Sequence, residues 1–225
     1  MHNQEKDAIQ MAANRKKILE VGYGLFVQRT IDGVSLDQVA KASEIGVATL
    51  YRYFGGKTDL AVEIFVWKWK TFWDAYIEER EADPGMTAAQ RFAVYLDTFI
   101  ELYRNHRDFL RFNQFFNVYM QGIKVDQKQQ LPYESMIDGF ADHFREIWEQ
   151  GEKDGTLRTE TPWQKVFSAT LHIMLAAATR YAVGLMYQPK EAGDPEEELV
   201  ALRNLLYREY AKDMDLSGHE KRDSL

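Results

Sequence analysis

Residues 35–57 read SLDQVAKASEIGVATLYRYFGGK and predict two short helices joined by a tight turn. Ser35 is followed three positions later by Gln38, which is the pattern of a capping box at a helix start. A polar turn then ends at Gly46, a residue that can act as the N-cap of a second helix. From Val47 to Phe54 the apolar residues resume a helical period. This stretch therefore predicts a helix–turn–helix unit.

The second helix of this unit leaves a mixed face of small, hydroxyl-bearing and basic side chains. Leu50 and Phe54 are one turn apart and are expected to face the core. The outer face is formed by Val47, Ala48, Thr49, Tyr51, Arg52 and Tyr53. A helix with small residues at its start, followed by arginine and tyrosine, suits a DNA major groove, although many helix–turn–helix pairs bind nothing.

The stretch also resembles the tetracycline-repressor (TetR) family of bacterial regulators. Residues 49–60, TLYRYFGGKTDL, match the family signature T-L-Y-x-Y-F-x-x-K-x-x-L, and residues 39–40 match its I-A pair; the match covers about residues 14–62. The resemblance implies an all-α protein: an N-terminal three-helix DNA-binding domain and a C-terminal helical domain for ligand binding and dimerisation. It also implies a transcriptional repressor that a small molecule releases from a palindromic operator.

Several positions depart from the family pattern. Thr30 and Glu44 stand where the family has glycines, and Gly46 and Gly56 stand where it has capping serines. Because a left-handed backbone costs a residue other than glycine about 1–2 kcal/mol, we expect the turn at Glu44 to be altered. Val34 replaces a threonine whose hydroxyl could hold a phosphate.

The resemblance and the side-chain chemistry together assign two sets of DNA contacts. Val47, Ala48 and Arg52 are expected to face bases, since arginine can bind guanine O6 and N7 together and small apolar groups can touch a thymine methyl. Hydroxyl and ammonium groups suit phosphate oxygens. The expected phosphate contacts are Ser35, Thr49, Tyr51, Tyr53 and Lys57.

The charge distribution supports an N-terminal DNA-binding unit on an acidic body. The net charge of the 225 residues is −7. Residues 1–57 contain eight Lys/Arg and six Asp/Glu, a net of +2, which leaves 20 basic against 29 acidic residues, a net of −9, for the remainder. Such asymmetry favours nucleic-acid binding by the N-terminal part, although an excess of +2 is small.

Composition argues against catalysis, metals and cofactors. Cysteine is absent, which excludes disulfides, thiolate chemistry and cysteine-ligated zinc. The five histidines show no metal-binding spacing, and no phosphate-binding glycine loop or nucleophile elbow is present. The N-terminus is polar, and the most apolar run, residues 173–178, is too short to span a bilayer. We expect a cytoplasmic protein that is not an enzyme; an all-α enzyme is the less favoured alternative.

The rest of the chain predicts further helices, about nine in all, with no strand-like alternation. We divide the chain into a helix–turn–helix domain (1–56), a helical body (57–215) and a flexible tail (216–225). A long helix over about residues 57–81 should connect the first two. Capping boxes are expected at residues 87–90 and 161–164, and a polar loop at 124–130 should precede the helix after Pro132.

The body is expected to dimerise and to bind a ligand. The helices at 161–187 and 194–213 are more apolar than one small bundle needs, so they predict a C2 homodimer interface, unless they only complete a monomer core. Aromatic residues between 65 and 148 either fill the core or, as the resemblance implies, line a pocket for an apolar or aromatic molecule. The predicted pocket residues are Trp73, Tyr95, Phe99, Phe112, Phe116, Phe140, His143, Phe144 and Met174, with Tyr95 and His143 as polar contacts.

Two questions about control stay open from the sequence. Ligand binding could swing the 57–81 helix and so change the distance between two recognition helices, which would weaken operator affinity. Alternatively, a protein partner could control a dimeric DNA-binding regulator, and a densely packed body would favour that version.

Overall fold

The computed structural model describes residues 2–124, 126–184 and 193–212. Over these residues the chain is helical, with one isolated bridge between Leu157 and Ala211 in place of any strand. The helices are α1 His2–Arg29, α2 Leu36–Ala42, α3 Val47–Phe54, α4 Lys57–Arg80, α5 Ala88–Asn105, α6 Arg107–Gln121, α7 Gln127–Asp154, α8 Trp163–Val183 and α9 Pro195–Tyr210. The predicted all-α fold of about nine helices is confirmed for the described ranges, and the predicted tail at 216–225 lies outside them.

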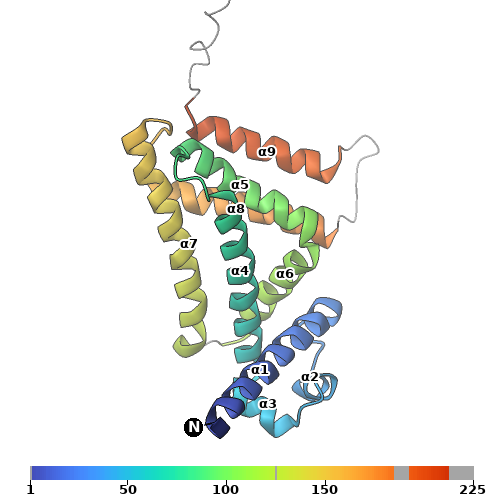
Figure 1. The fold of residues 1–225 in the computed structure, drawn as a ribbon. Coiled ribbons are helices and arrows are strands. Elements are labelled where there is room, and N and C mark those ends of the chain that lie inside the picture. Colours follow the sequence, from blue (N-terminus) through green and yellow to red (C-terminus); the bar gives the residue numbers. More distant parts are fainter. Residues whose placement is uncertain (1, 125, 185–192, 213–225) are drawn as a thin grey trace, which may run out of the picture.

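The helices are arranged as a small N-terminal group joined by α4 to a larger body (Figure 1). Helices α1, α2 and α3 gather at one end of the molecule, and α4 runs from them toward α5, α8 and α9 at the other end. Helix α7 packs along α4, and α6 packs on both α1 and α8. Two helices, α4 and α6, therefore connect the N-terminal group to the body.

Helix starts follow the predicted capping in two cases. The Ser35 hydroxyl accepts the Gln38 amide at 3.2 Å, and the Gln38 side chain accepts the Ser35 amide at 2.9 Å. Thr87 and Gln90 make the same reciprocal pair at the start of α5. Each pair satisfies two backbone donors that a helix start leaves without an intrahelical acceptor.

Two other predicted helix starts were wrong. Asp126 and Gln129 form a capping box that the sequence analysis missed, so α7 begins at Gln127 inside the predicted loop 124–130 and includes Pro132. At the start of α8, Pro162 is itself the N-cap, with no side-chain cap bond. Because Pro162 has extended backbone (φ −54°, ψ 132°), the helix begins one residue later than the predicted box requires.

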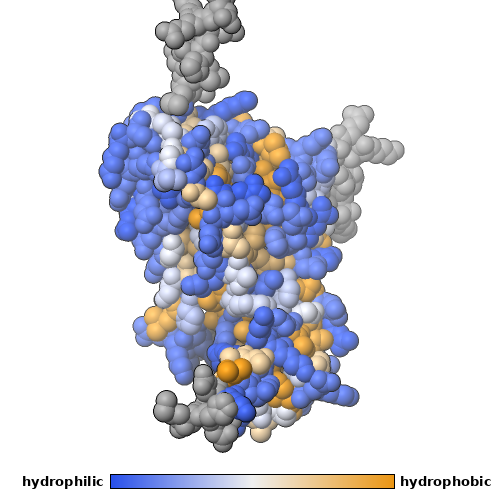
Figure 2. All heavy atoms as spheres, in the orientation of Figure 1, coloured by the Kyte–Doolittle hydropathy of each residue, from blue (hydrophilic) through white to orange (hydrophobic). Residues whose placement is uncertain are grey.

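Helix α8 lies in the middle of the body. It packs on α5, α6, α7 and α9, and its inner side buries residues such as Phe167, Thr170 and Met174. By length and composition alone α8 could also cross a membrane, but a core helix of a soluble protein passes the same test. Its outer side leaves Ile173 43% exposed. On the face of the molecule seen in Figure 2, most side chains are hydrophilic and the hydrophobic ones are scattered among them.

Candidate nucleic-acid interface

Helix α3 has one buried and one exposed side. Leu50 is fully buried and Phe54 is 3% exposed, which confirms their predicted place in the core. On the other side, Val47 is 39% and Tyr51 is 49% exposed. The remaining predicted contacts on α3 are the exposed Ala48 and Arg52 and the half-buried Thr49 and Tyr53. The α3 side chains expected to face bases are therefore all at the protein surface.

The turn between α2 and α3 keeps a left-handed residue despite the missing glycine. Glu44 has φ 56°, and Thr30, after α1, has φ 64°. The expectation that Glu44 would alter the turn was therefore wrong. The Lys17 ammonium lies 2.6 Å from a Glu44 carboxylate oxygen, and this hydrogen bond, with the lysine charge, holds the pKa of Glu44 below its usual value. The strained conformation is thus accompanied by an ion pair to α1.

Lys57 is engaged within the protein. Its ammonium donates to the carbonyls of Ile31, Asp32 and Val34 at 3.1, 3.4 and 3.2 Å. An ammonium has three donors, and three backbone acceptors are within reach here. Lys57 therefore fastens the loop before the Ser35 cap, which the sequence analysis did not foresee. A phosphate contact by Lys57 stays a prediction.

A hollow of about 290 Å³ lies beside the start of α2. Its lining consists of Ser35, Leu36, Asp37, Tyr51, Gly56 and Lys57. Three of the predicted phosphate contacts, Ser35, Tyr51 and Lys57, are thus brought to one place, while Thr49 and Tyr53 are not part of it. The Asp37 carboxylate at the same hollow would repel a phosphate, so hydroxyl and ammonium groups must dominate there if DNA binds.

Arg15 joins three helices of the N-terminal part, a function that the sequence analysis missed. Its guanidinium pairs with Glu63 on α4, with Nε 2.6 Å from Oε1. It also donates to the Tyr53 carbonyl at 3.2 Å and lies 4.9 Å from the centre of the Phe54 ring. Because these contacts depend on three separate helices, no local sequence pattern indicates them. Arg15 is therefore engaged within the protein, although its side chain is 43% exposed.

A lysine among aromatic rings marks the junction of α1, α4 and α6. The Lys68 ammonium lies 4.5 Å from the Tyr23 ring centre, 5.5 Å from that of Trp67 and 5.9 Å from that of Phe109. Burial lowers the pKa of Lys68. Cation–π contacts of this kind favour the charged form and partly offset its desolvation. The junction between the N-terminal group and the body is thus partly aromatic and partly charged.

The predicted ligand residues pack on one another in this structure. All of them except the half-buried His143 are buried. The rings of Trp73 and Phe140 are 4.4 Å apart, and those of Tyr95 and Phe144 are 4.9 Å apart. Four hollows found on the described residues are lined by other side chains. The observed arrangement is an aromatic core, and a ligand role for these residues stays a prediction.

Both predicted polar contacts have partners within the protein. The Tyr95 hydroxyl is 3.1 Å from that of Thr170, and Nε2 of His143 is 3.2 Å from a Glu81 oxygen. Arg91 pairs with the other Glu81 oxygen at 2.8 Å. Burial alone would raise the pKa of Glu81, but the bonds from His143 and Arg91 hold it below its usual value. Glu81, which follows α4, thus binds α5 through Arg91 and α7 through His143, while the Tyr95–Thr170 pair separately joins α5 to α8.

The comparisons with known proteins agree with this architecture. Residues 18–64 match the family described as bacterial regulatory proteins, tetR family. An HTH-type transcriptional regulator of Staphylococcus aureus (strain bovine RF122 / ET3-1) is 34% identical over 83 residues, which cover 34% of this chain and 43% of that protein. The chain thus spans less than half the length of the curated relatives it matches.

Solved structures share the fold over most of the chain. A regulator from Saccharomonospora viridis in complex with choline has a TM-score of 0.70 at 16% identity, covering 89% of this chain and 99% of its own. FadR from Bacillus subtilis in complex with stearoyl-CoA has a TM-score of 0.67 at 14% identity, covering 85% and 97%. AibR, in complex with isovaleryl coenzyme A and operator DNA, has 0.64 at 15%, covering 86% and 98%.

Fold and surface together define a helix–turn–helix unit of the kind found in the bacterial regulators that the chain resembles. Residues 18–64 are similar to the DNA-binding part of the bacterial regulatory proteins, tetR family, and the rest of the chain shares its fold with solved regulators. These relatives are transcriptional regulators rather than enzymes, in agreement with the sequence analysis.

Proposed function

We propose that this protein is a ligand-responsive regulator that binds a palindromic DNA operator as a homodimer and represses transcription until a small molecule releases it. Residues 1–56 read the DNA, and residues 57–215 hold the ligand and the dimer interface. The observation that carries the proposal is the exposed side of α3, with Val47, Ala48 and Arg52 at the surface over a buried Leu50. A regulator of this kind works in the cytoplasm.

Dimerisation is supported by the outer sides of α8 and α9. On α8, Ala169, Ile173 and Ala176 are exposed on one stripe, and on α9 Ala201 and the 65% exposed Leu205 share a face. Small and apolar residues on adjacent helices allow close approach of a second copy. A C2 dimer would give two recognition helices for two half-sites of a palindrome.

Control by a small molecule is supported by the neighbours in complex with choline, stearoyl-CoA and isovaleryl coenzyme A. Helix α4 offers a route for the signal, since it begins beside α3 and runs along α7 in the body. The close packing of the aromatic rings is the observation that favours the alternative, a dimeric regulator controlled by a protein partner.

The decisive experiment is selection of bound duplexes from a random DNA library by the purified protein. Enrichment of an inverted repeat supports the proposal, whereas folded protein that enriches no sequence contradicts it. On the selected operator, Arg52→Ala should weaken discrimination at one base pair per half-site by about 1–3 kcal/mol. Arg145→Ala, an exposed change on α7, serves as the matched control and should leave binding unchanged.

A further inference from the structure

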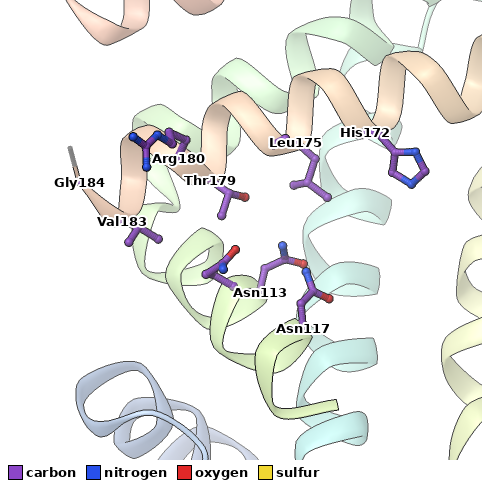
Figure 3. Close-up of a pocket in the computed structure, with 10 residues that line it drawn as sticks. Asn113, Asn117, His172, Leu175, Thr179, Arg180, Val183 and Gly184 are labelled. Carbon is purple, nitrogen blue, oxygen red and sulfur yellow. The ribbon is translucent and has the colours of Figure 1, made fainter. Parts of the chain in front are cut away.

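A groove of about 380 Å³ runs between α6 and α8, on a different side of α6 from the junction with α1 (Figure 3). Helix α6 contributes three amides, Asn113, Gln114 and Asn117. Helix α8 contributes His172, Leu175, Ala176, Thr179, Arg180, Val183 and the following Gly184. The volume is at the lower end of the range for small-molecule sites, so it suits a compact ligand.

One wall of the groove contains a polar atom with no partner. Thr179 is 6% exposed, and its Oγ1 is buried without a hydrogen-bond partner among the described residues. Figure 3 shows Thr179 on α8 facing α6, opposite Asn113, which is only 4% exposed. A buried hydroxyl without a partner costs free energy, so its position at a groove calls for a ligand atom or water to bond it.

The lining indicates the charge of the ligand. Arg180 and His172 border the groove, and no aspartate or glutamate is part of it. A guanidinium binds a carboxylate with two parallel hydrogen bonds, while amides and a hydroxyl bind further oxygens of the same molecule. Leu175 and Val183 provide apolar contact for a short carbon skeleton, while Ala176 borders the groove on the stripe proposed to face the second copy.

We propose that this groove, rather than the aromatic core, is the effector site of the protein, and that its ligand is a small organic carboxylate. The regulatory role of this groove rests on the proposed function. Asn113 lies in the groove, and the adjacent Phe112 packs on α1, with ring centres 5.5 Å from Tyr23 and 6.5 Å from Phe26. A ligand that forms a hydrogen bond with Asn113 therefore binds next to Phe112, the residue that contacts α1.

The test measures ligand binding without DNA, so it stays valid if the proposed DNA function fails. Three probes are 3-hydroxybutyrate, 4-hydroxybenzoate and hexanoate, each compared with its methyl ester, and binding is followed by calorimetry and by the melting temperature. At least one carboxylate should bind and its ester should not. Thr179→Val should lower the affinity about tenfold, the effect of one buried hydrogen bond. Arg180→Ala should remove the preference for the acid over the ester.

A second readout separates ligand binding from a structural role of Thr179. Because its hydroxyl has no partner, Thr179→Val should leave the melting temperature of the ligand-free protein unchanged or raise it. Thr170→Val on the same helix is the matched control. Thr170 is fully buried and bonded to the Val166 carbonyl at 2.7 Å, so this change should lower the melting temperature and spare the ligand affinity.

Three results would overturn the inference. The first is failure of all three carboxylates to bind at millimolar concentration. The second is carboxylate binding that survives both Thr179→Val and Arg180→Ala but is lost in a core variant such as Phe140→Leu. The third is a weaker dimer in Thr179→Val and Arg180→Ala protein without ligand, since the groove would then be filled by the second copy.

Discussion

The proposed DNA-binding side of α3 and the aromatic residues of the body were both assigned from helical spacing, yet that spacing separates inside from outside only on α3. On α3, Tyr51 and Arg52 are exposed between the buried Leu50 and Phe54, because a short helix that packs on one side has a clear inside and outside. In the body, helices such as α8 have neighbours on several sides. Periodicity there identifies buried residues but does not separate a packed ring from one that lines a cavity.

The largest effect is expected at Phe112, which is fully buried and contacts rings of α1, α4 and α6. If the body is solid core, Phe112→Ala should lower the free energy of unfolding by about 3–5 kcal/mol, measured by urea denaturation. A loss below about 1 kcal/mol would indicate space beside the ring and would favour the predicted pocket.

The network at Glu81 should give the next effect. Glu81→Gln removes a carboxylate that bonds Arg91 and His143, at a cost of about 2 kcal/mol at neutral pH. The folded state lowers the pKa of Glu81, so its contribution is complete above the unfolded value of about 4.3 and is lost as the pH falls through the lower folded value. Unfolding curves of both proteins should therefore converge in acid.

If the difference in unfolding free energy between the two proteins stays constant down to strongly acidic pH, the ionised form of Glu81 contributes nothing to stability. Glu79→Gln is the control in the same helix end, since Glu79 is exposed and pairs only loosely with Arg80, at 3.7 Å.

A substitution of Lys57 tests whether this residue stabilises the fold, binds DNA, or does both. Lys57→Met should lower the free energy of unfolding by about 1–2 kcal/mol, because three carbonyls of the 31–34 loop lose their donor. Operator affinity should fall alike for all sequences if the ammonium also meets phosphate. Unchanged stability with weaker binding would assign Lys57 to DNA alone. Lys41→Met, an exposed change on α2, is the control.

The smallest effect concerns the missing glycine after α1. Thr30→Gly should raise the free energy of unfolding by less than about 1 kcal/mol, since relief of the left-handed strain at φ 64° is offset by the entropy of the unfolded chain. It also loses the bond from the Gly33 amide to the Thr30 hydroxyl. Ala75→Gly, exposed within α4, should instead cost about 1 kcal/mol. If Thr30→Gly and Ala75→Gly lower the free energy of unfolding equally, Thr30 is unstrained.

The sequence was sufficient for features that depend on local order. The capping boxes at Ser35 and Thr87, the buried Leu50 and Phe54 and the long α4 follow from residues within a turn or two of each other. The missed features depend on partners far along the chain. Arg15 with Glu63, and Lys57 with the 31–34 loop, are pairs that no spacing rule brings together. The groove between α6 and α8 is a further case, since its amides read as ordinary surface residues.

The attachment of α9 has a consequence for experiments at different ionic strength. Leu199 is the only residue of α9 that is fully buried, and ion pairs join the helix to α5, Arg203 with Asp97 and Arg104 with Glu196, both at 2.7 Å. Hydrogen bonds from the Arg158 guanidinium to main-chain carbonyls fasten its last turn. Added salt weakens such charged links as well as contacts to phosphate. Because α9 is part of the proposed dimer interface, a salt titration of operator binding would then report both dimerisation and DNA binding. The number of phosphate contacts should therefore be taken from a variant whose dimer is covalently fixed.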